Sequence, residues 1–201
     1  GIAGLTQTAP GILDKSISVL GNRGPDDHDT LSYPRCALGH TRLAIIDLAT
    51  GHQPMRDASQ DIAIVFNGEI YNYKELRKNL EQKGHVFVTQ SDTEVILKSY
   101  MEYGDACPEH LDGQFAFGIW DNKKARLFLA RDRFGEKPLY VTSDGDTILF
   151  ASEIKALLAT GRVSNETDHV SLDNYLSLMY VPPWRSIYKH IKPLPPAHSA
   201  Y

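Results

Sequence analysis

Short apolar runs separated by turn-forming residues constrain the fold of this chain more than any other feature of its sequence. Runs of this length, rich in Ile, Val, Phe and Tyr, predict strands, several of them buried on both faces. From residue 113 to 151 the runs follow one another as hairpins do, which indicates antiparallel pairing. The predicted strands are Ile2–Leu5, Leu43–Ile46, Ile62–Phe66, Phe115–Trp120, Leu127–Ala130, Leu139–Thr142 and Ile148–Ala151.

Helical patterns occupy separate blocks of the sequence. In the clearest one, Leu76 and Leu80 lie on one face among charged residues, and Gly84 favours an end to the helix. The next begins with polar capping residues and stops before Gly104. We expect helices over Tyr73–Lys83, from a cap at Ser91 or Asp92 to Tyr103, and over Ile12–Leu20.

Strands and helices that are grouped in this way, without a regular βαβ alternation, predict an α+β fold with antiparallel sheets covered by helices. The chain of 201 residues is ordinary for one domain with a sizeable core. We place that domain at residues 1–180. Residues 181–201 are rich in proline and are predicted to form an extended connector towards a further domain.

Composition excludes several classes of function. The formal charge is −4, with 21 Lys and Arg against 25 Asp and Glu, so no basic surface indicates nucleic acid or an anionic membrane as the main partner. No apolar run approaches the ~20 residues that span a bilayer. Cys36 and Cys107 are far apart and predict neither a disulfide framework nor a metal site, so a reducing cytoplasm is the expected location. Two common nucleotide-binding glycine motifs are absent from the sequence.

Three polar positions have both a structural and a functional interpretation. Arg42 stands at the start of a strongly apolar predicted strand, where its guanidinium suits either a ligand carboxylate or a structural salt bridge. Asn67 and Gly68 form a pair that favours a type I′ hairpin turn, although Glu69 adds a further polar group there. Asp92 stands at a helix start and is, in the simpler interpretation, an N-cap.

Taken together, nine segments of the chain resemble the amino-terminal glutaminase domain of glutamine-hydrolysing asparagine synthetases, in sequence and in order. No single segment is specific, but their order along the whole chain is. The segments are Gly1-Ile-Ala-Gly, Arg23-Gly-Pro-Asp, Gly39-His-Thr-Arg-Leu-Ala-Ile-Ile-Asp, Gly51-His-Gln-Pro-Met, Phe66-Asn-Gly-Glu-Ile-Tyr-Asn, Ser91-Asp-Thr-Glu-Val-Ile, Leu111-Asp-Gly-Gln-Phe-Ala-Phe, Leu129-Ala-Arg-Asp-Arg-Phe-Gly-Glu-Lys-Pro-Leu-Tyr and Phe150-Ala-Ser-Glu-Ile-Lys.

This resemblance implies a class II glutamine amidotransferase with the N-terminal-nucleophile hydrolase fold, a four-layer αββα sandwich of two antiparallel sheets. It implies that a Cys at the amino terminus attacks the side-chain amide of L-glutamine, which yields glutamate and ammonia. The implied oxyanion hole consists of the Asn67 side chain and the Gly68 amide. The implied substrate-binding residues are Arg42 for the α-carboxylate, Asp92 for the α-ammonium, and Glu69, Leu43, Ala44, Ile45 and Ile46 along the pocket.

The resemblance implies no cofactor and no metal for this domain. ATP and Mg²⁺ are expected only in the ATP-dependent synthetase domain of the same parent chain, which would use the ammonia to form asparagine. That domain and L-glutamine are the expected partners, and a homodimer is left open.

Two departures from the family pattern matter. The expected Cys would stand directly before Gly1, so we expect the chain as written to bind glutamine without hydrolysing it. Either a residue precedes Gly1 or the gene product has lost the thiol. Asn22 stands where many relatives have His. Two rival functions remain: a glutaminase that supplies ammonia for a sugar, purine or polysaccharide, and a glutamine-binding domain without catalysis.

Overall fold

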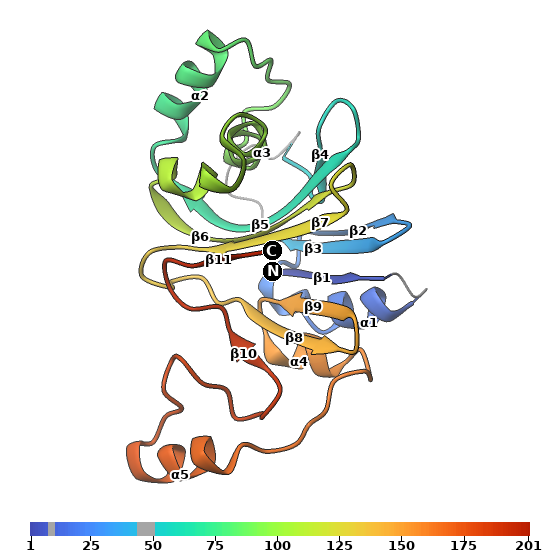
Figure 1. Ribbon diagram of the computed structural model, residues 1–201, viewed down its shortest axis with the longest axis vertical. Coiled ribbons are helices and arrows are strands. Elements are labelled where there is room, and N and C mark those ends of the chain that lie inside the picture. Colours follow the sequence, from blue (N-terminus) through green and yellow to red (C-terminus); the bar gives the residue numbers. More distant parts are fainter. Residues whose placement is uncertain (8–10, 44–50) are drawn as a thin grey trace.

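The computed structural model describes residues 1–7, 11–43 and 51–201, and its strands form two antiparallel sheets (Figure 1). The six-stranded sheet has the order β10-β8-β9-β1-β3-β2 and consists of β1 (Ile2–Thr6), β2 (Asp27–Tyr33), β3 (Cys36–Arg42), β8 (Tyr140–Asp144), β9 (Thr147–Ala151) and β10 (Lys192–Pro193). The five-stranded sheet has the order β11-β7-β6-β5-β4 and consists of β4 (Met55–Arg56), β5 (Ile62–Ile70), β6 (Gly113–Asp121), β7 (Arg126–Arg131) and β11 (Ser199–Ala200).

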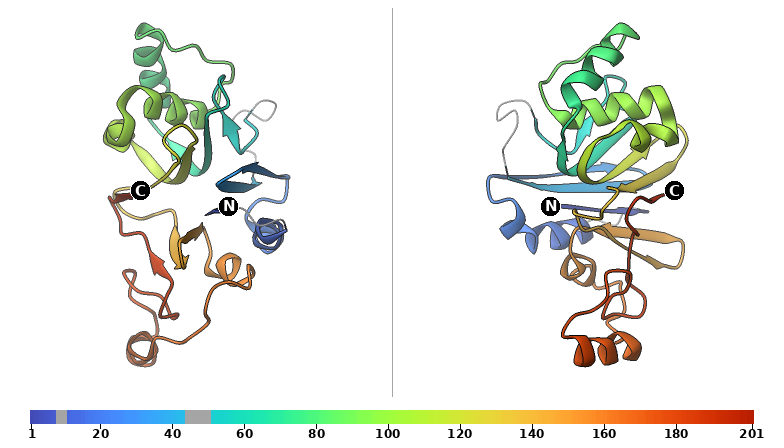
Figure 2. Two further views of the ribbon diagram at one scale, coloured as in Figure 1. Left: turned by 45° about the vertical axis from the view of Figure 1, so that its right-hand side comes forward. Right: turned by 90° about the vertical axis from the view of Figure 1, so that its left-hand side faces the viewer.

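Helices cover the outer faces of both sheets (Figure 2). The six-stranded sheet is covered by α1 (Ile12–Ser18) and α4 (Ile154–Leu158), and the five-stranded sheet by α2 (Tyr73–Gln82) and α3 (Asp92–Tyr103). Two 3-10 helices, η1 (Gly21–Arg23) and η2 (Gly104–His110), follow α1 and α3. A further helix, α5 (His169–Leu178), lies apart from the sheets (Figure 1). The predicted four-layer αββα sandwich is confirmed.

Three hydrophobic cores hold these four layers together. The central core lies between the sheets, where Leu38 of β3 and Val65 of β5 are fully buried. A second core joins the five-stranded sheet to its helices through residues such as Leu80. A third joins the other sheet to its helices through residues such as Ile17. Strands that pack against cores on both faces, such as β1, β6 and β7, therefore appear as continuous apolar runs.

The predicted helices are confirmed with small changes at their ends. The helix expected at Tyr73–Lys83 ends at Gln82, and the one expected at Ile12–Leu20 ends at Ser18. Ser91 is the cap of α3, because its hydroxyl accepts a hydrogen bond of 3.1 Å from the Thr93 amide. Asp92 is the first residue of that helix and not its cap.

The hairpin turn that the Asn67-Gly68 pair predicts is wrong. Both residues lie inside the continuous strand β5, where Asn67 pairs with Ala116 and Gly68 with Phe115 of β6. Gly68 has φ 151°, and a Cβ atom on it would lie 2.1 Å from the Gln114 carbonyl oxygen. The glycine therefore serves close strand pairing and not a turn, since a long apolar ladder outweighs local turn preference.

One predicted strand is placed differently, and five were not predicted: the long strands β2 and β3 and the two-residue strands β4, β10 and β11. The strand expected at Leu43–Ile46 is absent at Leu43, which follows the end of β3 at Arg42, and Ala44–Ile46 lie outside the described residues. Neither β2 nor β3 was predicted, because β2 is mostly polar and exposed and β3 carries glycine, histidine and arginine. Tertiary burial of β3 between its neighbours overrides its weak local preference.

The proline-rich segment 181–201 returns to the body of the protein and adds a short strand to each sheet. The Leu194 amide donates to the Leu139 carbonyl at 2.8 Å, and the Thr142 hydroxyl donates to the His190 carbonyl at 2.8 Å. Ile191 is only 1% exposed. The division at residue 180 stays a prediction, and these contacts make it testable.

Truncation after Tyr180 should destabilise the fold. Deleting Ile191 and Leu194 uncovers apolar surface in two cores, and buried Leu or Ile side chains contribute about 2–5 kcal/mol each. We expect the free energy of unfolding in urea to fall by at least that amount, whereas deletion of the exposed Tyr201 alone should have no measurable effect. Equal stability of the two truncated chains would instead support a domain that ends at residue 180.

Candidate functional site

The first residue of the chain is fixed inside the molecule, at the end of the central strand β1. The Gly1 nitrogen donates to the Thr41 carbonyl oxygen at 2.7 Å, and the Thr41 amide donates to the Gly1 carbonyl oxygen at 2.8 Å. Burial lowers the pKa of the Gly1 α-amino group to about 5, Arg23 lowers it further, and Glu153 opposes the shift. An amine with such a pKa is uncharged at neutral pH.

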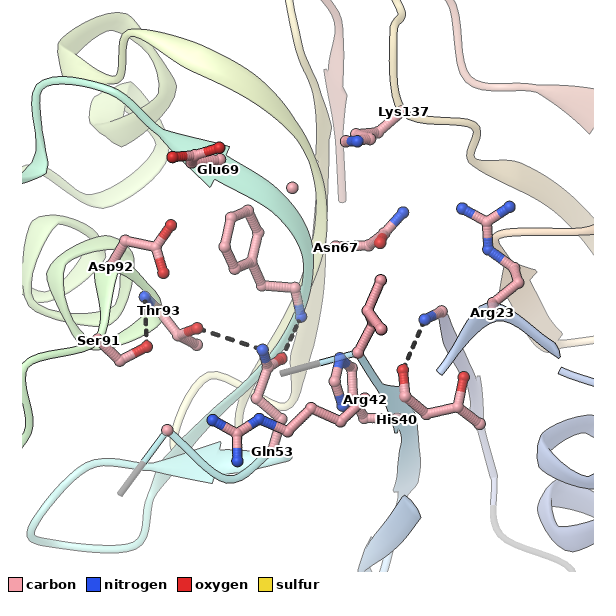
Figure 3. Close-up of a pocket in the computed structure, with 16 residues that line it drawn as sticks. Arg23, His40, Arg42, Gln53, Asn67, Glu69, Ser91, Asp92, Thr93 and Lys137 are labelled. Carbon is pink, nitrogen blue, oxygen red and sulfur yellow. Dashed lines mark hydrogen bonds between the residues drawn. The ribbon is translucent and has the colours of Figure 1, made fainter. Parts of the chain in front are cut away.

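A cavity of about 240 Å³ opens beside Gly1, where the edges of both sheets meet the start of α3 (Figure 3). Its wall combines cationic, anionic and amide side chains, as a site for a small polar ligand requires. The lining residues are Gly1, Arg23, His40, Thr41, Arg42, Leu43, Gly51, Gln53, Phe66, Asn67, Gly68, Glu69, Ser91, Asp92, Thr93 and Lys137.

Asn67 is the most informative residue of this cavity. Its side-chain Nδ2 is buried, and within the described part of the chain it has no hydrogen-bond partner. Figure 3 shows the amide in the middle of the pocket, with Asp92 and Glu69 on one side and Arg23 on the other. A buried donor that lacks a partner costs about 1–3 kcal/mol, so such a group is retained where a ligand can accept its hydrogen bond.

The acidic wall of the cavity is formed by Asp92 of α3 and Glu69 of β5 (Figure 3). Burial raises the pKa of the Asp92 carboxyl, and the charge of Glu69 raises it further. Hydrogen bonds from backbone amides, among them a 3.1 Å bond from Ile70, act in the opposite direction. A bound cation would stabilise two such neighbouring carboxylates.

The basic side chains of the cavity are Arg23, Arg42 and Lys137. Arg42, at the end of β3, is 7% exposed. Arg23 forms an ion pair of 3.1 Å with Glu153. The structure thus gathers every predicted site residue that it describes, namely Arg42, Leu43, Asn67, Gly68, Glu69 and Asp92, around one cavity; Ala44, Ile45 and Ile46 lie outside the described residues.

Sequence reasoning missed Gln53, which connects two walls of the cavity. Its Oε1 accepts from the Phe66 amide at 2.6 Å, and its Nε2 donates to the Thr93 hydroxyl at 3.2 Å. Phe66 precedes Asn67 and Thr93 follows Asp92, so Gln53 holds these two site residues in a fixed relation. Gln53 belongs to the Gly51-His-Gln-Pro-Met segment, one of the nine that resemble the family, but the resemblance gave no role to this glutamine.

His40 and the two cysteines do not supply a reactive group. Burial lowers the pKa of His40 to about 3, so its ring is neutral at physiological pH. Cys36 and Cys107 are fully buried away from the cavity, and burial raises the pKa of both thiols. No residue among those that line the cavity is a thiol.

No group of three or more His, Cys, Asp or Glu side chains in the described residues could hold a metal ion. None of the helices in the described ranges has the length and apolar character required to cross a membrane.

Comparison with known sequences agrees with this geometry. A family model for a glutamine amidotransferase domain matches residues 1–201. Asparagine synthetase (glutamine-hydrolyzing) 3 of Bacillus subtilis strain 168 is 42% identical over 190 residues, which cover 93% of this chain and 31% of the relative. Amidase chyE of Penicillium rubens is 41% identical over 150 residues, which cover 74% of this chain and 22% of the relative.

Comparison with solved structures supports the fold alone. The glutamine phosphoribosylpyrophosphate amidotransferase of B. subtilis superposes with a TM-score of 0.67 at 24% identity, over 80% of this chain and 43% of that one. The chain spans about a third of the length of the asparagine synthetases that it matches. The resemblance to the amino-terminal part of that family is confirmed.

Replacing Gln53 with methionine should lower stability, because the buried Phe66 amide and the Thr93 hydroxyl lose their shared partner. We expect a loss of about 1–3 kcal/mol in the free energy of unfolding, measured in urea. Thr93→Val removes only the longer of the two hydrogen bonds and should cost less. In the double variant the two losses should not add. Additive losses would show that Gln53 does not connect the two walls.

Proposed function

The chain belongs to the glutamine amidotransferase domain family, and from this premise we propose that this domain, with a Cys directly before Gly1, hydrolyses L-glutamine to glutamate and ammonia for asparagine synthesis by an ATP-dependent synthetase domain of the same parent chain. The observation that carries the proposal is the Asn67 amide. It is a buried donor without a protein partner, placed between opposite charges in the cavity beside Gly1. Hydrolysis of an amide needs such a donor where negative charge develops on oxygen.

The nucleophile in this proposal is the thiol of a Cys directly before Gly1. Gly1 borders the cavity, so a preceding residue would stand within it, whereas Cys36 and Cys107 are buried elsewhere. A terminal Cys combines a thiol of pKa about 8.5 with an α-amine of about 7.7–8.0, so the amine can act as the base.

The reaction then proceeds in balanced steps. The amine takes the thiol proton while the sulfur attacks the side-chain carbonyl carbon of glutamine. The Asn67 side chain and the Gly68 amide stabilise the oxyanion. The protonated amine returns its proton to the leaving nitrogen, which departs as ammonia and leaves a glutamyl thioester. Water hydrolyses the thioester to glutamate and regenerates the thiol.

The charges of the cavity suit the main-chain groups of an amino acid. We assign the α-ammonium of glutamine to Asp92 and Glu69, where it offsets the repulsion between the two carboxylates. We assign the α-carboxylate to Arg42, whose guanidinium can donate two parallel hydrogen bonds. Leu43 lines the same cavity.

The proposed acceptor of the ammonia has less support than the proposed hydrolysis of glutamine. Asparagine synthesis is supported by relatives that are named asparagine synthetases and match nearly the whole chain. Amidase chyE shows that a similar sequence also occurs under another name. Acceptors such as a sugar, a purine or a polysaccharide are the second candidate. We also propose a cytoplasmic location, which the free thiols of Cys36 and Cys107 support.

Adding Met-Cys before Gly1 tests the central step. Removal of the Met leaves a free terminal Cys, and this form should release glutamate and ammonia from L-glutamine at an enzymatic rate. A matched Met-Ala form and the chain that begins at Gly1 should bind glutamine but not hydrolyse it. If the folded, correctly processed Cys form is inert, or if the chain from Gly1 is already active, the mechanism is wrong.

Asn67→Asp in the Cys-bearing form tests the oxyanion assignment. The change keeps the size of the side chain but replaces the donor with a carboxylate, so turnover should fall by about 10²–10³, as it does when one oxyanion donor is lost. The matched control is Asn122→Asp, in a turn outside the cavity, which keeps the oxygen that accepts from the Trp120 indole. Equal turnover of the two variants would remove Asn67 from the mechanism.

A further inference from the structure

Lys137 is a charged residue of the cavity to which the proposed mechanism gives no role. It lies in the segment between β7 and β8 and borders the cavity opposite α3 (Figure 3). Within the described part of the chain, its ammonium group forms no ion pair or hydrogen bond. Lys123, by contrast, pairs with Asp61 at 2.9 Å. The charge of Lys137 is thus available to a ligand.

The backbone that carries Lys137 is held by the buried carboxylate of Asp132. Its Oδ1 accepts from the amides of Phe134 and Glu136, each at 3.0 Å. Its Oδ2 accepts from the Lys137 amide at 3.0 Å and from the Phe115 amide of β6 at 3.2 Å. Burial alone would raise the pKa of the Asp132 carboxyl, but these amides lower it below its usual value, so the anchor stays charged.

Arg131 holds the same segment from its carbonyl side. Its Nε donates to the Lys137 carbonyl, one terminal nitrogen donates to the Gly135 carbonyl and the other to the Leu194 carbonyl, all at 2.7 Å. Lys137 is therefore bonded through its amide to Asp132 and through its carbonyl to Arg131. A lysine on an ordinary surface loop does not need its backbone held in this way. A side chain whose charge must act at a fixed point does need it.

The Lys137 ammonium lies near one end of the proposed substrate. In Figure 3, Asp92 and Glu69 lie on one side of Asn67, Arg23 lies on the other, and Lys137 lies next to Asn67, above it in this view. If the proposed function is correct, the α-ammonium of the ligand binds on the acidic side and its side-chain carbonyl lies at Asn67. The side-chain end therefore faces Lys137. In L-glutamine this end is neutral, and in L-glutamate it is a full negative charge.

We propose that Lys137 is a specificity-determining residue that recognises negative charge at the side-chain end of the bound amino acid. It stabilises the γ-carboxylate of L-glutamate and, during the reaction, the charge that develops on the same carbon's oxygen. It contributes little to the binding of neutral L-glutamine. The proposal rests on the proposed function, because it needs the ligand orientation given there.

Calorimetry on the chain Gly1–Tyr201 separates the two ligands without any need for catalysis. We expect Lys137→Met to weaken L-glutamate binding about tenfold, as the loss of one charged hydrogen bond does, and to change L-glutamine binding by less than about twofold. Lys137→Arg should retain most of the glutamate affinity, because it keeps the charge. Lys123→Met, at an exposed ion pair outside the cavity, should leave both affinities unchanged.

The outcomes separate this inference from the function on which it rests. Unchanged glutamate affinity in Lys137→Met, or an equal loss for both ligands, overturns the role of Lys137 while glutamine binding by the unmodified chain still supports the proposed function. A loss in Lys137→Arg as large as in Lys137→Met would also overturn it, since shape and not charge would then matter. Failure of the unmodified chain to bind L-glutamine would contradict the proposed function itself, and this inference with it.

Discussion

Two reciprocal hydrogen bonds between Gly1 and Thr41 place the start of the chain inside the molecule, and the site depends on them. The next residue is held in the same way, because Ile2 donates to the Ser152 hydroxyl at 2.9 Å and accepts from the Ser152 amide at 2.9 Å. Chain termini usually fray, since few contacts offset their conformational entropy. Here β1 lies between β3 and β9 in a buried sheet, so Gly1 becomes a fixed part of the cavity wall.

The second wall comes from β5, and its accuracy depends on contacts that are distant in sequence. Pairing with β6 keeps Asn67 in an extended strand, and Gly68 permits the approach of Gln114. Gln53 ties this strand to α3, so Asn67 and Asp92 cannot move independently. Packing alone would hold the sheets together, but only such directional bonds fix side chains to within the tolerance that amide chemistry needs.

The charged and polar groups around the cavity lower the stability of the fold when no ligand is bound. Asp92 and Glu69 repel each other, and the amide of Asn67 is buried without a partner. Lys137 is held in place by a buried carboxylate and by Arg131, while its own ammonium remains unpaired within the described residues. These three unfavourable features lie together in one cavity. Proteins retain such a concentration of unfavourable polar groups where a ligand compensates for it.

The sequence by itself determined the fold class and three of the four helices that cover the sheets, because apolar periodicity and helix caps are local properties. The site residues came from the resemblance of nine ordered segments to a known family. The sequence misassigned Asn67-Gly68 as a turn and missed β2 and β3, because the signal of these segments is weak until their neighbours are in place. Only the tertiary structure decided that Arg42, Asn67 and Asp92 share one cavity, and that Gln53 and Lys137 belong to it. The physical reason is that a hydrogen bond between Gln53 and Thr93, or the anchoring of Lys137 through Asp132, depends on strand pairing across many residues, which no local pattern encodes.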